Sequence, residues 1–250
     1  MNNVLITRMH GCGNQFLLIQ ERAVQEEAYY GELSVHLATQ YSFDQLLVLQ
    51  QKKEGFTFLI INREGSVGKQ CLNGARCVAH YLVTKKLVIP PSFVIANVSG
   101  SIPVIFTDPS SIQLTLPMPR CMPAVENAIG VDVGNPHVIF FVDSVTQVNV
   151  EDRGRSMQSL FTDGINVGFV ECIDRTHIRL RTYERGCGET AACGSSALAS
   201  VFAGMLTDLL AETVRVSFGL NNYFLSIKKI KNGMQMIGPS HLDDEFFIIA

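Results

Sequence analysis

The chain repeats a set of landmark residues at a nearly constant interval. The segment Cys71-Leu-Asn-Gly-Ala75 matches Cys193-Gly-Ser-Ser-Ala197 at a shift of 122 residues. One match carries little weight in a chain with 20 glycines, but several in the same order indicate a duplicated unit whose polar residues converge on a shared cleft. The other pairs, at shifts of 121 or 122, are Gly13-Asn14 with Gly134-Asn135, Gln45 with Asn166, and Asn62 with Glu184.

A proline-rich stretch divides the chain near its middle. The 250 residues suffice for one large domain or two small ones. Leu116–Pro123 holds three prolines, and because proline disrupts central strands and helices we expect a linker there. The predicted halves are residues 1–117, joined by a C-terminal strand at 244–250, and residues 118–243.

Residue patterns predict a mixture of strands and helices. Segments rich in Ala, Leu and small residues predict buried helices from about 74 to 86 and from about 195 to 210, each beginning beside a cysteine. A weaker amphipathic pattern predicts a helix over Tyr30–Gln40. Runs of β-branched and aromatic residues predict strands at Phe56–Ile61, Phe93–Asn97, Ile102–Phe106, Ile112–Leu116, Val138–Val142 and Val214–Phe218.

Composition excludes several classes of partner. A net charge of -3 gives no basic footprint for nucleic acid or for an acidic membrane surface. No apolar run approaches the roughly 18 residues that a membrane-spanning helix needs. The polar segment Met1–Arg8 does not resemble a signal peptide, so we expect a cytoplasmic protein.

Seven cysteines in a chain without a secretory signal are expected to be reduced. The spacing of six in Cys71–Cys77 and in Cys187–Cys193 is loose for structural zinc, so we expect no metal. Burial as small hydrophobic residues is expected for Cys77, Cys121 and Cys172.

Cys71 and Cys193 each precede a predicted helix. Free N–H groups at a helix start favour an anion, so they lower the pKa of a thiol and hold a carboxylate. Racemisation needs a base on one face of a carbon and an acid on the other, and a thiolate with a thiol meets that need without a cofactor. The sequence therefore predicts a two-thiol epimerase or racemase.

Five blocks of sequence resemble the diaminopimelate epimerase family, and they span the chain to about residue 200. The most specific are Gln70-Cys-Leu-Asn-Gly-Ala-Arg-Cys77 and Tyr183-Glu-Arg-Gly-Cys-Gly-Glu-Thr-Ala-Ala-Cys-Gly-Ser195. The others are Met9-His-Gly-Cys-Gly-Asn-Gln-Phe16, Phe43-Asp-Gln-Leu-Leu47 and Gly134-Asn-Pro-His137.

The resemblance implies an α+β fold of two pseudo-symmetric halves, each a curved mixed sheet around a central helix, with the active site in the cleft between them. It implies a cofactor-independent interconversion of LL- and meso-2,6-diaminopimelate, which supplies lysine and peptidoglycan precursors. The implied partner is a small diamino dicarboxylic acid. A homodimer is left open, because the tail Leu242-Asp-Asp-Glu-Phe246 lacks the aromatic residue usual before the aspartate.

The matched motifs also imply roles for individual residues. Cys71 would remove the proton from the LL substrate and Cys193 would return one to the other face, while His137 and Glu184 would tune the thiol pKa values. Arg185, with Asn62 and Asn166, would hold the distal carboxylate, and Glu184 would take the distal ammonium. The implied substrate contacts are Asn14, Gln45, Asn62, Leu72, Asn73, Asn135, Asn166, Glu184, Arg185, Gly194 and Ser195.

Two departures bear on the substrate. Family members usually have Asp where this chain has Gln15, and Gly where it has Leu72. The alternatives are therefore a racemase of another amino acid, such as glutamate or histidine, on the same scaffold, a related binding module, or a thiol-ligated metal protein.

Overall fold

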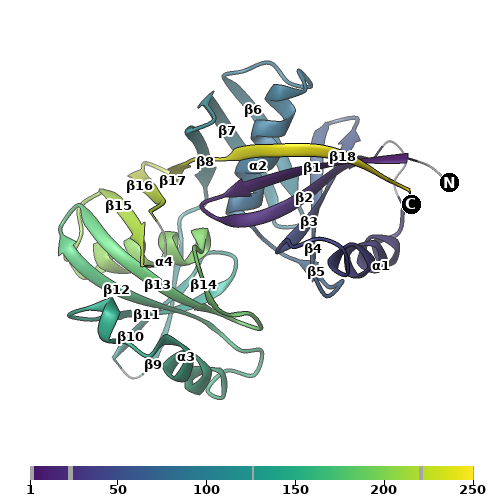
Figure 1. Ribbon diagram of the computed structural model, residues 1–250. Helices are drawn as coiled ribbons and strands as arrows, with labels where there is room; N and C mark the ends of the chain where they lie inside the picture. The colour runs from purple at the N-terminus through teal and green to yellow at the C-terminus, as the bar shows by residue number, and fades with distance from the viewer. Residues whose placement is uncertain (1–2, 22–24, 126, 220–221, 250) are drawn as a thin grey trace. The chain divides into compact units, whose positions relative to one another are not determined.

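A computed structural model describes residues 3–21, 25–125, 127–219 and 222–249 and divides the chain into two compact units (Figure 1). Unit 1 comprises Met1–Leu114 with Gly238–Ala250, and unit 2 comprises Thr115–Ile237. The boundaries expected from the sequence were 117/118, from the prolines, and 243/244, from the predicted C-terminal strand. Ala250 of the predicted C-terminal strand lies outside the described residues.

In unit 1, the strands follow one another in the sheet as β18-β1-β2-β3-β4-β6-β7-β8, and the short β5 pairs with β4. The pairs β2–β3 and β4–β6 are parallel and the others antiparallel. The elements are β1 (Asn3–Gly11), β2 (Asn14–Glu21), α1 (Glu27–Ala38), β3 (Gln45–Lys52), β4 (Gly55–Asn62), β5 (Val67–Gly68), α2 (Leu72–Thr84), β6 (Ser92–Asn97), β7 (Gly100–Asp108), β8 (Ser111–Leu116) and β18 (His241–Ile249).

In unit 2, the strands follow the order β9-β10-β11-β12-β13-β15-β16-β17, and the short β14 pairs with β13. Here β11–β12 and β13–β15 are the parallel pairs. The elements are β9 (Arg120–Val125), β10 (Ala128–Asp132), β11 (Pro136–Phe141), η1 (Val145–Gln147), α3 (Val150–Gln158), β12 (Asn166–Asp174), β13 (His177–Glu184), β14 (Gly188–Thr190), α4 (Gly194–Leu206), β15 (Thr213–Phe218), β16 (Phe224–Ile230) and β17 (Gly233–Gly238).

The two units have the same topology, and the strand registers repeat as well. Phe16 pairs with Gln45 across β2 and β3, and His137 pairs with Asn166 across β11 and β12. Each residue of the second pair follows its counterpart by 121 positions. The duplicated, pseudo-symmetric fold expected from the sequence is thereby confirmed.

Each sheet curves around one buried helix (Figure 1). In α2, every residue from Leu72 to Leu82 is buried, and α4 buries most of its length. Because a helix without a solvent-facing side needs apolar contacts all round, the strands of each unit enclose it. Both helices end at equivalent places, followed by Lys86 and Asp208 in the left-handed conformation at φ of 57° and 55°. The second predicted helix therefore stops at Leu206 instead of Leu210.

A second helix covers the other face of the central strands in each unit. In unit 1, Tyr30, Leu33 and Leu37 of α1 pack on strand residues such as Leu17 and Val48. In unit 2, Val150 and Met157 of α3 pack on β11 and β12 residues including Phe140 and Phe169. The central strands are thus buried on both faces, which fixes the ends that carry Gln45, Asn62, His137 and Asn166.

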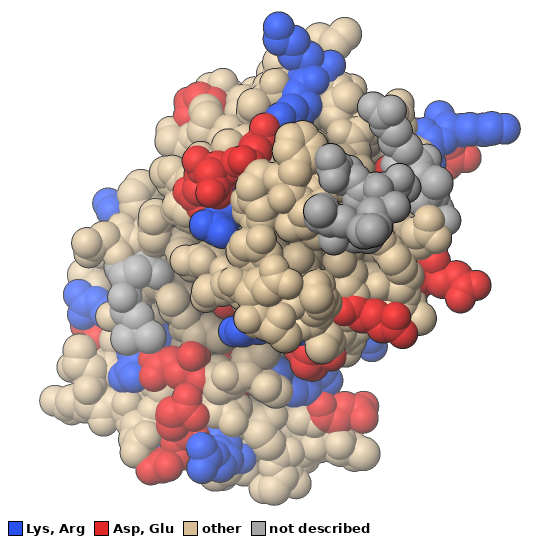
Figure 2. Space-filling view, turned by 45° about the vertical axis from the view of Figure 1, so that its right-hand side comes forward, with Lys and Arg blue, Asp and Glu red and all other residues tan. Residues whose placement is uncertain are grey.

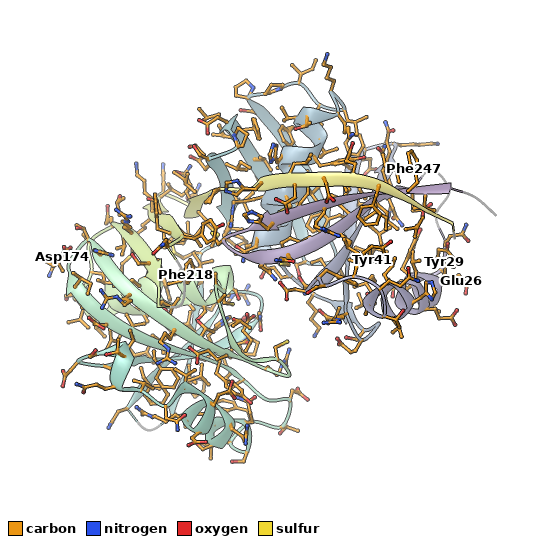
Figure 3. The ribbon with its side chains drawn as sticks, viewed as in Figure 1. Glu26, Tyr29, Tyr41, Asp174, Phe218 and Phe247 are labelled. Atoms are coloured by element: carbon orange, nitrogen blue, oxygen red, sulfur yellow. The ribbon has the colours of Figure 1, made fainter. Side chains whose placement is uncertain are left out.

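Side-chain views show how the exposed parts are arranged. Figure 3 labels Tyr29 on α1, Tyr41 just after that helix, and Asp174 at the turn between β12 and β13. The Asp174 carboxylate accepts hydrogen bonds from the Thr176 amide at 2.6 Å and hydroxyl at 2.7 Å, which closes that turn.

On the face shown in Figure 2, basic and acidic side chains are interspersed, in line with the small net charge. Among the described residues, no helix is both long and apolar enough to cross a membrane.

The predicted strands are confirmed, but the linker prediction was wrong over Arg120–Pro123. These residues belong to β9, which pairs with β10. Its register shifts between Ala128 and Gly130 of the partner strand, next to Pro123. Proline is tolerated at strand edges and bulges because no ladder hydrogen bond is required there.

Candidate active site

The helix start of unit 1 presents the thiol of Cys71. Cys71 is the N-cap of α2, with extended backbone at φ −144° and ψ 104°, and its Sγ accepts a hydrogen bond from the Gly74 amide at 3.3 Å. The thiol also lies 3.8 Å from Oδ1 of Asn14. The sulfur therefore caps the helix as a serine hydroxyl does, among N–H groups that favour a thiolate or a carboxylate.

Asn14 is held by the carboxylate of Asp44, a residue for which the sequence predicted no role. The Asp44 carboxylate accepts a hydrogen bond from Asn14 Nδ2 at 2.6 Å and from the Gln15 amide at 2.7 Å. This contact turns Asn14 Oδ1 toward Cys71. Asp44 lies within the Phe43–Leu47 block, so its motif position was the only available signal.

The amides of Gln45 and Asn62 face each other across β3 and β4. Gln45 Nε2 donates to Asn62 Oδ1 at 2.8 Å, and Asn62 Nδ2 donates to the Ser66 hydroxyl at 2.9 Å. Gln45 Oε1 is buried without a hydrogen-bond partner among the described residues. An orphaned acceptor of this kind is suited to a ligand donor such as an ammonium.

The helix start of unit 2 presents Cys193 next to a carboxylate. Cys193 is the N-cap of α4 and is 5% exposed. Its thiol lies 3.2 Å from Glu184 Oε2, and Thr190 donates to the other carboxylate oxygen at 2.5 Å. The buried thiol and the half-buried carboxylate thus form a pair of acids in contact.

The prediction that a helix start lowers the thiol pKa is wrong for Cys193. Burial raises its pKa well above the ordinary value, and the Glu184 carboxylate raises it further. Hydrogen bonds from Ser195 and from the Ser196 amide act in the opposite direction but are weaker. Cys193 is consequently a protonated thiol at neutral pH, which suits an acid more than a base.

His137 is connected to Cys193 through Ser195. Nε2 of His137 lies 3.1 Å from Ser195 Oγ, which lies 3.3 Å from Cys193 Sγ. Burial lowers the pKa of His137 to about 4, so the ring is neutral at pH 7. Its Nδ1 lies 2.8 Å from the Asn135 carbonyl oxygen.

The side chain of Asn166 is hydrogen-bonded to the backbone of Arg185. Asn166 Oδ1 accepts from the Arg185 amide at 3.1 Å, and Asn166 Nδ2 donates to Asn135 Oδ1 at 2.8 Å. The exposed guanidinium of Arg185 donates to the Asp163 carbonyl oxygen at 2.9 Å. Among the described residues this is the one hydrogen bond of the guanidinium, and at an exposed position it leaves most of the fork accessible to an anion.

The structure also locates the remaining predicted contacts. Leu72 is 3% exposed and Asn73 is 3% exposed in the first turn of α2, and Gly194 is buried in the first turn of α4. Within unit 1 the structure brings together Asn14, Cys71 and Asn73, and also Gln45 with Asn62. Within unit 2 it brings together Asn135, His137, Asn166, Glu184, Arg185, Cys193 and Ser195.

The other cysteines differ in exposure. Cys77 is buried as expected, and burial raises its pKa to about 12. The prediction of burial was wrong for Cys121 and Cys172, which are exposed on strands. Cys172 lies at a register shift of the β12–β13 hairpin, where the alternation of buried and exposed positions breaks. In the described part of the chain, no cluster of His, Cys, Asp and Glu side chains could hold a metal ion.

The fold matches solved structures over almost their whole length. A PhzF-family phenazine biosynthesis protein from Enterococcus faecalis shares 13% identity at a TM-score of 0.77, with 100% of both chains covered. A predicted epimerase from Pseudomonas aeruginosa shares 11% identity at a TM-score of 0.76, again with 100% of both chains covered. A hydroxyproline epimerase from Agrobacterium vitis shares 11% identity at a TM-score of 0.74, with 98% of this chain and 92% of that chain covered.

These likenesses define the fold class, a duplicated α+β architecture of the kind found in PhzF proteins and amino-acid epimerases. The sequence defines the family more narrowly. The family model described as diaminopimelate epimerase matches residues 6–115 and 129–242. The chain belongs to the diaminopimelate epimerase family.

Proposed function

We propose that this protein is a cofactor-independent epimerase that interconverts LL- and meso-2,6-diaminopimelate, with Cys71 and Cys193 as the two proton-transferring thiols. The observation that carries the proposal is the equivalence of the two helix starts. In each unit, a cysteine in extended conformation precedes the central buried helix at the same repeat position.

The proposed reaction moves one proton off the α-carbon and another onto its opposite face. With the LL substrate, Cys71 acts as thiolate base and Cys193 as thiol acid. The raised pKa of Cys193 supports this assignment, because an acid must hold its proton until the carbanion forms. Proton transfer alone completes the reaction, so two thiols suffice and each turnover leaves their protonation states exchanged.

The helix starts are proposed to bind the α-carboxylate. Free backbone N–H groups at the start of α2 and α4 stabilise an anion, and they stabilise more strongly the enolate-like charge that develops on deprotonation. Asn14, Asn73, Leu72, Gly194 and Ser195 would contribute to this subsite through backbone or side-chain atoms.

The remaining residues are proposed to select the distal end of diaminopimelate. Arg185 offers two parallel N–H donors to a carboxylate, and Asn62 and Asn166 would add amide donors. The orphaned oxygen of Gln45 would accept a hydrogen bond from the distal ammonium. Glu184, predicted to take that ammonium, lies 3.2 Å from the Cys193 thiol and is proposed to accept instead from the ammonium on the reacting carbon. Asn135 would support Asn166 through their amide contact.

We extend the proposal to the cellular location and metabolic role of the protein. The enzyme would act in the cytoplasm on a small amino acid, in the supply of lysine and cell-wall precursors, with a homodimer left open by the altered C-terminal motif. Membership of the family and a mechanism that needs reduced thiols support this part of the proposal.

Incubation of the reduced protein with separate amino acids in deuterated water tests the function. Diaminopimelate should gain deuterium at an α-carbon and equilibrate between its LL and meso forms. Glutamate, histidine and hydroxyproline should exchange much more slowly, because they lack a distal ammonium with a carboxylate. Faster exchange of one of these would assign a different racemase on the same scaffold, and no exchange in any would overturn the epimerase proposal.

A further inference from the structure

The carboxylate of Glu184 accepts hydrogen bonds from two different side chains, one at each oxygen. Cys193 Sγ donates to Oε2 across 3.2 Å, and Thr190 Oγ1 donates to Oε1 across 2.5 Å. The last torsion of a glutamate side chain has only a broad preference, so hydrogen bonds decide where its two oxygens point. The Thr190 hydroxyl thus takes one oxygen and turns the other toward the thiol.

Strand register brings Thr190 to this carboxylate. In the antiparallel pair of β13 and β14, Thr182 lies opposite Thr190, and Glu184 lies opposite Gly188. Thr182, Glu184 and Thr190 therefore share one face of the pair, because side chains two residues apart point to the same side. Thr190 is the diagonal neighbour of Glu184, at a separation that a long side chain can bridge.

The opposite face of β14 is anchored through Glu189. Its carboxylate accepts two hydrogen bonds from the guanidinium of Arg181, at 2.6 and 2.8 Å, and both side chains are mostly buried. Arg181 Nη1 also donates to two backbone carbonyl oxygens in and beside η1. The Glu189 amide donates to the Glu151 carboxylate at 2.8 Å. A bidentate pair of this kind has a fixed geometry, so it holds the three-residue strand and with it the Thr190 hydroxyl.

At the equivalent position, unit 1 carries a glycine in place of the threonine. Thr190 corresponds to Gly68 at the repeat shift of 122, and Gly68 lies in β5 at the same strand register. The counterpart of Glu184 is Asn62, a neutral amide that bonds to the side chains of Gln45 and Ser66. A Cβ at Gly68 would lie 3.6 Å from Asn62 Oδ1, so a side chain there reaches the same place. The hydroxyl thus accompanies the unit that has a carboxylate beside its thiol.

We propose that Thr190 is a positioning residue, which holds the Glu184 carboxylate so that its second oxygen faces the Cys193 thiol and the ammonium on the reacting carbon. The inference rests on the proposed function, in which Cys193 is the acid and Glu184 accepts from that ammonium. Burial raises the pKa of Cys193 most, and the nearby carboxylate raises it further, which keeps the acid protonated before the transfer. A carboxylate released from Thr190 could turn away from both partners.

The test compares Thr190→Val, Thr190→Ser and the matched control Thr182→Val. Valine keeps the branched shape of threonine without the hydroxyl, whereas serine keeps the hydroxyl. Thr190→Val should lower kcat/KM for diaminopimelate by about ten- to hundredfold, as expected for a lost hydrogen bond to a charged group, and Thr190→Ser should retain most of the activity. Thr182 lies opposite Thr190 but donates to Ser196 at 3.0 Å, so Thr182→Val should lower thermal stability and leave kcat/KM unchanged. Equal losses of kcat/KM in Thr190→Val and Thr190→Ser, or no loss in Thr190→Val, would overturn the inference.

A double-mutant cycle separates positioning from a general structural role. Because Thr190 is proposed to act through Glu184, Thr190→Val should have little further effect on kcat/KM when Glu184→Ala is already present. A residue that only supports the fold would lower kcat/KM by the same factor in both backgrounds, and that result would overturn the inference.

Alkylation of Cys193 tests the contact without substrate and so distinguishes this inference from the proposed function. A carboxylate freed from Thr190 can turn away as the thiolate forms, so iodoacetamide at pH 8 should label Cys193 faster in Thr190→Val than in the wild type. The rate should stay at the wild-type value in Thr190→Ser and Thr182→Val, and Thr190→Val should add no increase to Glu184→Ala. An unchanged or slower rate in Thr190→Val would overturn the inference even if the protein epimerises diaminopimelate. Faster labelling in a protein that exchanges no amino acid would establish the positioning contact and refute the epimerase function.

Discussion

The ring of His137 accepts a hydrogen bond from the hydroxyl of Ser195. Nδ1 of His137 faces the Asn135 carbonyl oxygen at 2.8 Å, and a carbonyl can only accept, so the proton of the neutral ring is on Nδ1. Nε2 is then an acceptor, and Ser195 donates to it across 3.1 Å. Ser195 Oγ also lies 3.3 Å from the Cys193 thiol, whose proton faces the Glu184 carboxylate at 3.2 Å. Ser195 therefore connects the imidazole of His137 with the thiol of Cys193.

Ser195→Ala should slow epimerisation by about ten- to hundredfold, mainly in kcat. When Cys193 gives up its proton, the Ser195 hydroxyl can turn from His137 and donate to the sulfur, and this hydrogen bond favours the ionised form. The adjacent Ser196→Ala is the control. The buried Ser196 hydroxyl accepts a hydrogen bond from Thr182, and the Ser196 amide that bonds to the thiol is retained in the variant, so loss of the hydroxyl should reduce stability and spare kcat. Steady-state kinetics of both variants measures the difference. Equal effects on kcat would argue against a role for the hydrogen bond between Ser195 and Cys193.

Acid should destabilise the protein through His137. Its folded pKa of about 4 lies below the ordinary 6.5, so below pH 6.5 the unfolded chain takes up a proton that the native ring does not. Stability is therefore complete above pH 6.5 and falls as pH drops toward 4, by roughly 2 kcal/mol between pH 7 and pH 5. In urea titrations at these two pH values, His137→Asn should show a smaller loss than the wild type. His10 and His80, whose pKa values burial also lowers, contribute equally to both proteins.

Glu184→Gln should make Cys193 more reactive toward alkylation while impairing epimerisation. Removing the carboxylate charge removes a cause of the raised thiol pKa, so the thiolate fraction rises. Peptide mapping after iodoacetamide treatment at pH 8 measures this directly. The exposed thiols Cys121 and Cys172 act as internal references, because they should react alike in both proteins. Slower labelling of Cys193 in the variant would contradict the assigned role of Glu184.

Arg185→Lys should raise KM for diaminopimelate by roughly a hundredfold, because lysine cannot form the two parallel hydrogen bonds of a guanidinium with a carboxylate. Arg179→Lys, in the strand β13 that ends just before Arg185, is the control, since Arg179 pairs only with Glu171 in the described contacts. The measurement is KM for diaminopimelate in both variants, which should rise in Arg185→Lys and stay at the wild-type value in Arg179→Lys. A similar KM in Arg185→Lys and the wild type would show that the distal carboxylate binds elsewhere.

The fold was predictable because the landmarks of the repeat are fixed by strand register. Gln45 and Asn166 mark equivalent positions in the parallel pairs β2–β3 and β11–β12, and a slip of one residue would turn either side chain to the other face. The β9 strand was not predictable from local rules, because Pro123 is acceptable only where the pairing is interrupted. That interruption depends on β10, not on the sequence of β9 itself.

The site was predictable in its residues but not in its electrostatics. A cysteine before a helix predicts a lowered pKa, yet Cys193 is buried beside Glu184, and burial has the larger effect. Arg76 is visible in the motif, but its contact with Pro239 joins residues 163 positions apart. Contacts of this kind follow from tertiary packing and have no signature in sequence spacing.

The central claim is that the thiols of Cys71 and Cys193 both transfer protons. The most direct test is epimerisation in deuterated water by variants in which one cysteine at a time is replaced. Cys71→Ala and Cys193→Ala should each lose almost all conversion of LL- to meso-diaminopimelate, because a base without an acid cannot complete the inversion. Cys172→Ala, an exposed cysteine far from either helix start in sequence, should convert normally. Circular dichroism should show that all three variants are folded. Conversion near the wild-type rate by either Cys71→Ala or Cys193→Ala would contradict the two-thiol account.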